Sequence, residues 1–286
     1  MFKLVTWNIQ SGRDPDGQPD IGRVVTGLDR FADHDVVCLH EVASGFDPDR
    51  EDQFAALRNA LPVHVAALAF ACDIAALDGG AAAPRRRLGS MILSRHPLMQ
   101  VLRHSLPWPA DPAVPSMPRV ALEVTLATPG GPLRVIAAQL EFFSHQQRLA
   151  QVERLRELQR EARAHAARPR CDGSGAFAAV ARAAPALLAG YFNTLPGSPE
   201  HGRMLAPFGD DTPPWRDCWH LVQPGRRHAP TVGLHDLRPD AAPPFTVDYV
   251  FASADLAPRV RRMRVDASEQ GSEHQAVSVE LDWPLA

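Results

Sequence analysis

The sequence predicts a single α/β domain, residues 1–286, in which two β-sheets pack face to face and helices cover the outer faces. Short β-rich runs alternate along the chain with helical or loop segments, as this arrangement requires. Several of these runs are continuously apolar, which is typical of strands that are covered on both faces. The Pro- and Gly-rich stretches are short surface loops, and none of them separates the chain into two self-sufficient halves.

Eight segments are predicted to form strands because they are short and rich in apolar residues. They span Phe2–Asn8, Val36–Glu41, Ser90–Ser94, Val120–Leu126, Leu133–Gln139, Ala186–Gly190, Thr246–Ala252 and Val277–Leu281. Three helices are expected over 146–167, 52–60 and 21–32. In the first of them, leucine and valine recur at intervals of three and give one apolar face. The stretch 168–184 that follows is expected to be a mobile excursion.

The composition favours an ordinary soluble protein. The formal net charge of -3 lacks the strong positive field of a nonselective nucleic-acid binder, although a local basic patch is compatible with it. The four cysteines form no CxxC motif, so neither a zinc knuckle nor a disulfide framework is expected. The N-terminus does not resemble a signal peptide, and no run of about 18 apolar residues suggests a membrane span. A cytoplasmic location is therefore expected.

Five motifs place a polar residue at or beside the end of a predicted strand, namely Asn8, Glu41, Asn193, Asp248 and His274. The apolar strand before Glu41 offers a carboxylate on a rigid frame, and Mg²⁺ typically takes one or two protein carboxylates. Asp248 interrupts a run of bulky residues, and an unpaired buried carboxylate is costly, so we expect it to have a partner. Taken singly, each motif is also compatible with a polar strand end that faces solvent.

In this order and at these separations, the motifs resemble those of the endonuclease/exonuclease/phosphatase family, which includes the DNase I-like nucleases. They read Thr6-Trp7-Asn8, Leu39-His40-Glu41, Gly190-Tyr191-Phe192-Asn193, Val247-Asp248-Tyr249 and Ser272-Glu273-His274. The segment Gly89–Leu98 also resembles a central strand of the family, so the resemblance covers nearly the whole chain. It implies a four-layer α/β/β/α sandwich and a Mg²⁺-dependent phosphoesterase, with Mn²⁺ as the alternative ion.

The resemblance also implies a role for each matching residue. Glu41 corresponds to the principal metal-binding glutamate, and Asn8 to the asparagine that helps to position the metal or the phosphate. His274 corresponds to the histidine that contacts the phosphate and assists proton transfer, and Asp248 to the aspartate that orients it. Asn193 corresponds to the asparagine that steadies the nucleophile or the transition state.

Three positions depart from the family motifs. Tyr191 stands where the family has the aspartate that orients or deprotonates the attacking water, and a phenol with a pKa of about 10 is a poor base at neutral pH. Gln139 replaces a histidine but keeps a neutral hydrogen-bond donor. Glu273 replaces an aspartate and keeps its charge, so we still expect it to reach the metal, directly or through water.

Two hypotheses follow from these departures. In the first, the protein is an active phosphoesterase, with Glu141 as a replacement carboxylate and Arg87 as a phosphate ligand at the mouth of the site. A solvated loop is the simpler interpretation of Arg87. In the second, the protein is a catalytically impaired relative that binds a phosphate-containing ligand without turning it over. The sequence defines neither the oligomeric state nor the substrate class, whether nucleic acid, nucleotide or phospholipid head group.

Overall fold

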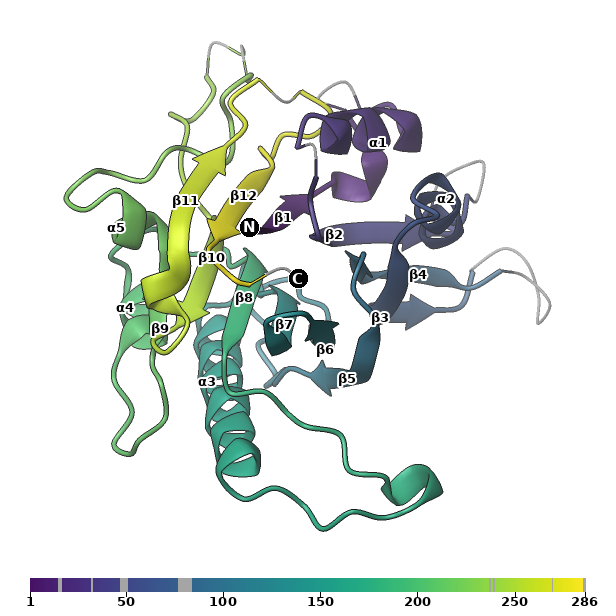
Figure 1. The fold of residues 1–286 in the computed structure, drawn as a ribbon. Helices are drawn as coiled ribbons and strands as arrows, with labels where there is room; N and C mark the ends of the chain where they lie inside the picture. The colour runs from purple at the N-terminus through teal and green to yellow at the C-terminus, as the bar shows by residue number, and fades with distance from the viewer. Residues whose placement is uncertain are drawn as a thin grey trace.

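Two six-stranded sheets pack face to face in the computed structural model of the chain (Figure 1). The structure describes residues 1–14, 17–31, 33–46, 51–76, 84–236, 238, 240–268 and 270–284. Helices cover the outer face of each sheet, and each helical layer has its own apolar core. The third core fills the seam between the sheets. The predicted four-layer α/β/β/α sandwich is therefore confirmed.

The two sheets have a similar plan. In spatial order the first contains β11 (Val260–Val265), β12 (Val277–Leu281), β1 (Phe2–Asn8), β2 (Val36–Ser44), β4 (Arg86–Ser94) and β3 (Val65–Ile74). The second contains β5 (Leu98–Ser105), β6 (Val120–Thr128), β7 (Gly131–Gln139), β8 (Ala186–Tyr191), β10 (Asp248–Ser253) and β9 (Trp215–Asp217). Each sheet has one parallel pair near its centre, β1 with β2 and β7 with β8, and the other named pairs are antiparallel.

The helices divide between the two outer faces. The first sheet is covered by α1 (Ile21–Asp29) and α2 (Gln53–Ala60), and the second by α3 (His145–Ala167) and α4 (Pro199–Leu205) (Figure 1). The short α5 (Cys218–Val222) follows β9, and single 3-10 turns occur at η1 (Gln10–Gly12), η2 (Gly175–Phe177) and η3 (Ala257–Arg259). Among the residues described, no helix combines the length and apolar character that crossing a membrane requires.

All eight predicted strands are present, with ends that shift by a few residues. The strand predicted from Thr246 begins at Asp248, because the backbone just before it bonds to the Thr231 segment instead. Of the helix predicted over 21–32, the structure has 21–29, and residue 32 lies outside the described part. The stretch 168–184 is mostly exposed, and its backbone is irregular except for η2. Its mobility stays a prediction. The strands not predicted are β3, β5, β9 and β11.

Candidate active site

Side chains from three neighbouring strand ends of the second sheet point into the seam between the sheets. Alternate residues of β7, β8 and β10 face the first sheet and form the inter-sheet core, and the next position in each series is polar. These positions are Gln139, Tyr191 and Asp248. Gln139 is the Cα partner of Tyr191, and Tyr191 is the Cα partner of Asp248, so the three side chains stand side by side.

Glu41 reaches the same place through an irregularity in β2. Strict alternation would turn it away from the seam, because Leu39 packs on the helical side. The pairing of β2 with β4 shifts register between Leu39 and Val42, and Glu41 has a φ of 56°. Such a bulge re-aims a side chain. The Glu41 carboxylate oxygen Oε1 consequently accepts hydrogen bonds from Asn8 Nδ2 at 3.0 Å and from Gln139 Nε2 at 2.7 Å.

Asn193 also has a left-handed backbone, with a φ of 53°. Non-glycine residues adopt this conformation rarely, and such strain persists only where the surroundings enforce it, often at functional sites. The Asn193 side-chain amide donates to the Leu140 carbonyl at 2.8 Å, which ties the loop after β8 to the end of β7. The two residues with a left-handed backbone, Glu41 and Asn193, come from β2 of the first sheet and from the loop after β8 of the second.

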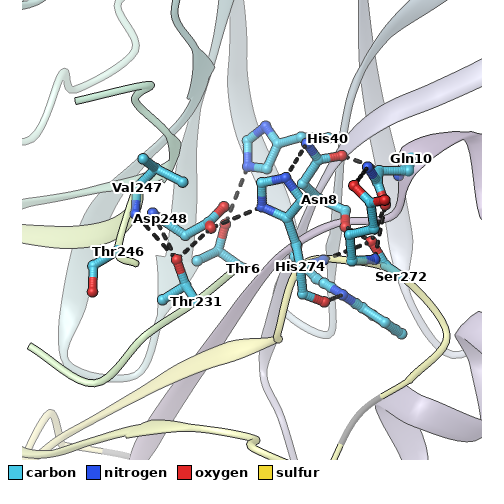
Figure 2. Close-up of polar contacts among 12 residues, drawn as sticks. Thr6, Asn8, Gln10, His40, Thr231, Thr246, Val247, Asp248, Ser272 and His274 are labelled. Atoms are coloured by element: carbon cyan, nitrogen blue, oxygen red, sulfur yellow. Dashed lines mark hydrogen bonds and ion pairs between the residues drawn. The ribbon is translucent and has the colours of Figure 1, made fainter. Parts of the chain in front are cut away.

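A chain of polar contacts joins the two sheets across the site (Figure 2). Thr231 Oγ1 donates to Asp248 Oδ2 at 2.7 Å, and His274 Nδ1 donates to the same oxygen at 2.9 Å. On its other side, His274 Nε2 lies 3.5 Å from Asn8 Nδ2, and Asn8 in turn binds Glu41. Five residues that are distant in sequence are thus linked through direct contacts.

The environment of His274 favours its charged form. Burial of the imidazole opposes protonation, but the charge of Asp248 and its hydrogen bond, followed by the charges of Glu41 and Glu273, outweigh it. The pKa of His274 is therefore raised above its usual value of 6.5. With Nδ1 fixed by Asp248, the nitrogen that gains or loses the proton is Nε2, which faces Asn8.

His40 lies beneath the cleft and has the opposite character. It is fully buried in the seam, with Nε2 3.1 Å from Thr6 Oγ1 and Nδ1 3.2 Å from Ser90 Oγ. Burial, and then the charge of His274, lower the pKa of His40 to about 3, so the ring is neutral. A Cβ atom on Gly190 would lie 2.9 Å from His40 Cε1 and 1.9 Å from a β7 carbonyl oxygen, so this position requires glycine.

Tyr191 is a buried, neutral phenol. Its ring meets that of His274 edge to face, with 4.6 Å between centroids. Burial, followed by the charges of Asp248 and Glu41, raises the pKa of Tyr191 well above its usual range, while Arg119 and the Asn193 side chain act in the opposite direction. The phenol therefore keeps its proton at neutral pH and packs against the His274 ring, and it cannot act as a base there.

Glu273 lies at the exposed rim of the site. Gln10 Nε2 donates to Glu273 Oε2 at 3.1 Å, and the backbone amide of Glu273 donates to Gln10 Oε1 at 2.8 Å. These two bonds tie the loop before β12 to the end of β1. Among the described residues, the group that hydrogen-bonds to the Glu273 carboxylate is thus the neutral amide of Gln10.

The site opens into a pocket of about 780 Å³. Tyr191 and His274 form part of its floor, while the exposed aromatic rings of Phe142 and Phe245 contribute to its walls. Its other lining residues are Gln10, Val232, Gly233, His235, Asp236, Arg238, Ala242 and Glu273. Several of these follow Thr231, so the segment that fixes Asp248 also shapes the pocket.

The structure places Arg87 and Glu141 elsewhere. Arg87 stacks on the Phe70 ring, 5.0 Å from its centroid, approaches Asp73 at 3.5 Å, and lines a separate hollow beside α2. Glu141 is fully buried, and its carboxylate binds Arg119 at 3.2 Å. Because β7 ends at residue 139, alternation does not carry Glu141 into the cleft. Both side chains bind partners outside the contacts that link Asp248 to Glu41, and their predicted contacts with substrate stay predictions.

Several supporting residues were not predicted. Thr231 fixes Asp248, Gln10 holds Glu273, and the indole nitrogen of Trp7 donates to the His274 carbonyl at 2.9 Å. Trp7 belongs to the first motif and Gln10 lies two residues after Asn8, so their closeness to Asn8 in the sequence was a usable signal. The segment that begins at Thr231 gave only a weak signal, as a loop leading to the Asp248 strand, and the bond between the two side chains depends on the folded path of that loop.

The chain belongs to the endonuclease/exonuclease/phosphatase family, whose sequence profile matches residues 5–274. No curated protein sequence matches it. Solved structures with a similar fold include two phosphatases, one of them bound to a DNA product.

Three solved structures illustrate the similarity. An endonuclease/exonuclease/phosphatase from Beutenbergia cavernae is 25% identical, with a TM-score of 0.64 over 97% of this chain and 70% of that one. The mannosyl-6-phosphatase of Bacteroides thetaiotaomicron is 15% identical, with a TM-score of 0.68 over 98% and 99%. The 3′ phosphatase NExo from Neisseria, bound to a product DNA hairpin, is 19% identical, with a TM-score of 0.62 over 99% and 100%. The last two share the fold with this chain.

Proposed function

We propose that this protein is a Mg²⁺-dependent phosphoesterase that hydrolyses a phosphate monoester or diester. The observation that carries the proposal is the unbroken chain of contacts from Asp248 through His274 and Asn8 to Glu41. A proton-carrying imidazole and a carboxylate suited to a divalent cation are thereby held near each other, with the Asn8 side chain between them. The strained backbone of Glu41 further indicates that its position is maintained for a function other than stability.

The oxygen donors of the cleft fit Mg²⁺. Glu41 Oε1 is held by two amide groups, while Oε2 has no hydrogen-bond partner among the described residues and is available to a cation. Glu273 offers a second carboxylate at the rim. One or two carboxylates, completed by waters and substrate phosphate, are the usual ligand set of this hard cation. When bound, such an ion supplies charge neutralisation at the phosphate and lowers the pKa of water.

The protein groups have separable roles in this proposal. Protonated His274 donates from Nε2 to a phosphate oxygen, where negative charge grows in the transition state. Asp248 holds the ring through Nδ1 and stabilises its charge. Asn193 and Gln139 contribute neutral amide hydrogens. Tyr191 cannot accept the proton of the attacking water, so the protein lacks a carboxylate base at that position and a slower reaction is expected.

A second candidate function is supported by that same tyrosine. Its ring occupies space beside His274 and its pKa is raised away from the neutral range, which favours a relative that binds phosphate esters without cleaving them. The two candidates differ in turnover and not in the ligand they hold. The aromatic walls of the pocket, Phe142 and Phe245, favour a substrate that presents a flat organic group, such as a nucleobase, beside its phosphate.

Phosphate release distinguishes the two candidates. The parent protein, Glu41→Ala and Glu280→Ala are assayed with a phosphomonoester and a phosphodiester probe, with Mg²⁺ or with EDTA. Glu280 is the matched control, because it is a partly buried glutamate of the same sheet that lies on β12 outside the pocket. We expect Mg²⁺-dependent turnover in the parent and in Glu280→Ala, and none in Glu41→Ala.

The competing outcome is also defined. A parent that binds the product phosphate ester but never releases phosphate, together with a Tyr191→Asp, Gln139→His double variant that does, would establish the binding function instead. Turnover that persists in Glu41→Ala would remove the metal assignment. A panel of a nucleoside monophosphate, a sugar phosphate, a short DNA and a phosphoinositide then separates the substrate classes.

A further inference from the structure

A second cluster of histidines surrounds a buried aspartate on the other side of β10. His201 lies on α4, Asp217 ends β9 and caps α5, and His228 lies in the loop that leads to Thr231. His201 Nε2 is 3.0 Å from Asp217 Oδ2, and His228 Nε2 is 2.9 Å from the same oxygen. The ligand atoms of these three residues all lie within 4.8 Å of one another.

The cluster contains a nitrogen that the protein leaves without a hydrogen bond. The side chain of His228 is only 3% exposed, yet its Nε2 makes no hydrogen bond to any described residue, despite its closeness to Asp217. Buried polar atoms are rarely left in this condition, because the loss of hydration is uncompensated. The Trp219 ring stacks on His228, with 5.6 Å between centroids, and holds the imidazole in this orientation.

The arrangement suits a tetrahedral cation better than a proton network. One Asp217 oxygen is approached by three imidazoles, because His220 Nδ1 also lies 3.5 Å away. Zinc bonds of about 2.0 Å in a tetrahedron separate neighbouring ligand atoms by about 3.3 Å, close to these spacings. Imidazole nitrogen is a ligand that Zn²⁺ accepts readily, whereas Mg²⁺ prefers oxygen. His220 is 48% exposed, so an ion could enter from its side.

We propose that His201, Asp217 and His228, completed by His220, form a structural zinc site that is separate from the active site. The site would join α4, β9, α5 and the 223–230 loop. Tyr249 separates it from the cleft: its ring lies 5.2 Å from His201 and 5.4 Å from His228, while the preceding residue, Asp248, faces the active site. The zinc would thus anchor the loop that delivers Thr231 to Asp248.

Metal uptake tests the proposal without reference to turnover. The full chain, freed of any affinity tag and stripped with a chelator, is titrated with Zn²⁺ while heat of binding and melting temperature are measured. We expect stoichiometric Zn²⁺, a higher melting temperature and no displacement by excess Mg²⁺. With Co²⁺ in place of Zn²⁺, a visible spectrum typical of tetrahedral nitrogen and oxygen ligands is expected.

Variants locate the bound ion. His228→Asn should abolish stoichiometric uptake and its thermal shift, whereas His104→Asn should retain both. His104 is the matched control, since it is a mostly buried histidine 3.0 Å from a buried carboxylate, Glu123, outside the cluster. Glu41→Ala should also retain the zinc, so failure of the proposed phosphoesterase would leave this result unchanged.

Three results would overturn the zinc site. They are the absence of Zn²⁺ uptake by the folded parent, equal uptake by parent and His228→Asn, and displacement of the ion by Mg²⁺. If His228→Asn does not fold, X-ray absorption at the zinc edge of the parent gives the decision. Several imidazole ligands around the ion would support the site, and a shell of oxygens alone would refute it.

Discussion

The two sheets contribute to the active site by the same construction but with different results. Each sheet brings the ends of one parallel strand pair to the seam, β1 with β2 and β7 with β8. The first sheet presents Asn8 and Glu41, which match the family motifs. The second presents Gln139 and Tyr191, which do not, and these two residues are direct Cα partners. Two of the three departures are therefore adjacent on the second sheet, and the third, Glu273, lies at the exposed rim beside Gln10.

The two residues of the second sheet that depart from the family motifs, Gln139 and Tyr191, are both uncharged. Gln139 uses its amide to bind Glu41, and Tyr191 keeps its proton because burial and two carboxylates raise its pKa. Of the three strand-end residues that the second sheet turns into the seam, Asp248 alone is a carboxylate. If the protein turns over phosphate esters, the charged groups that act on the phosphate must be the Asp248–His274 pair and the Glu41 carboxylate of the first sheet.

The largest expected effect comes from removing that charge. Asp248→Asn should lower kcat by about 10²–10⁴-fold, the usual worth of acid–base assistance. The charge of Asp248 also helps to raise the pKa of His274. Activity that needs the protonated ring is present at low pH and lost as pH rises through that pKa, so the variant should lose its remaining activity at lower pH. A pH–rate profile measures this shift.

A second aspartate–histidine pair provides the control. Asp35 Oδ1 lies 3.2 Å from His96 Nε2, at the opposite end of β2 from Glu41. Asp35→Asn should alter stability but leave the pH–rate profile where it is in the parent. An unshifted profile in Asp248→Asn would contradict the role given to His274.

Restoring the family residues on the second sheet should have the next largest effect. The Tyr191→Asp, Gln139→His double variant regains a carboxylate beside the cleft, and we expect kcat to rise by about 10²-fold. The single Gln139→His variant is the comparison, because it leaves the phenol in place. Loss of activity in the double variant, with an unchanged circular dichroism spectrum, would show instead that the Tyr191 hydroxyl takes part in the reaction.

The sequence predicted the inner strands of both sheets, whereas all the strands it did not predict lie at sheet edges. These are β11 and β3 in the first sheet and β5 and β9 in the second. β11 is covered on fewer sides and has a weak apolar pattern: it reads Val-Arg-Arg-Met-Arg-Val and is half exposed. β3 is apolar in sequence but is rich in alanine, which does not favour a strand. β9 has three residues, which is too short for a periodic signal.

The candidate site shows the same division between local and long-range information. Asn8, Glu41 and Asp248 were identifiable because each ends or interrupts an apolar strand. The contact of Glu141 with Arg119 depends on the pairing of β6 with β7, and that of Thr231 with Asp248 on the path of a long loop, so no local pattern encodes them. The turn of Glu41 into the cleft is likewise a product of its bulge, which strict alternation predicts wrongly.

A smaller effect is expected on stability at acid pH, and it comes from His40, which is buried between the two sheets. The pKa of His40 is about 3 in the folded protein and about 6.5 when exposed. The unfolded chain therefore binds the proton first, and stability that is present above pH 6.5 is lost as pH falls. The loss should reach about 2 kcal/mol near pH 5. Urea unfolding at several pH values should show this slope, and His40→Gln should flatten it.

The smallest expected effect concerns the pocket wall. Phe142 is 54% exposed and meets Phe143 edge to face, so its removal should cost the fold little. If its ring contacts the organic part of the substrate, Phe142→Ala should raise KM severalfold for a nucleoside monophosphate and leave kcat unchanged, because uniform binding is lost. Phe177, 82% exposed and outside the pocket, is the matched control. Equally weakened inhibition by inorganic phosphate, which has no organic part, would mean that Phe142 shapes the phosphate site itself.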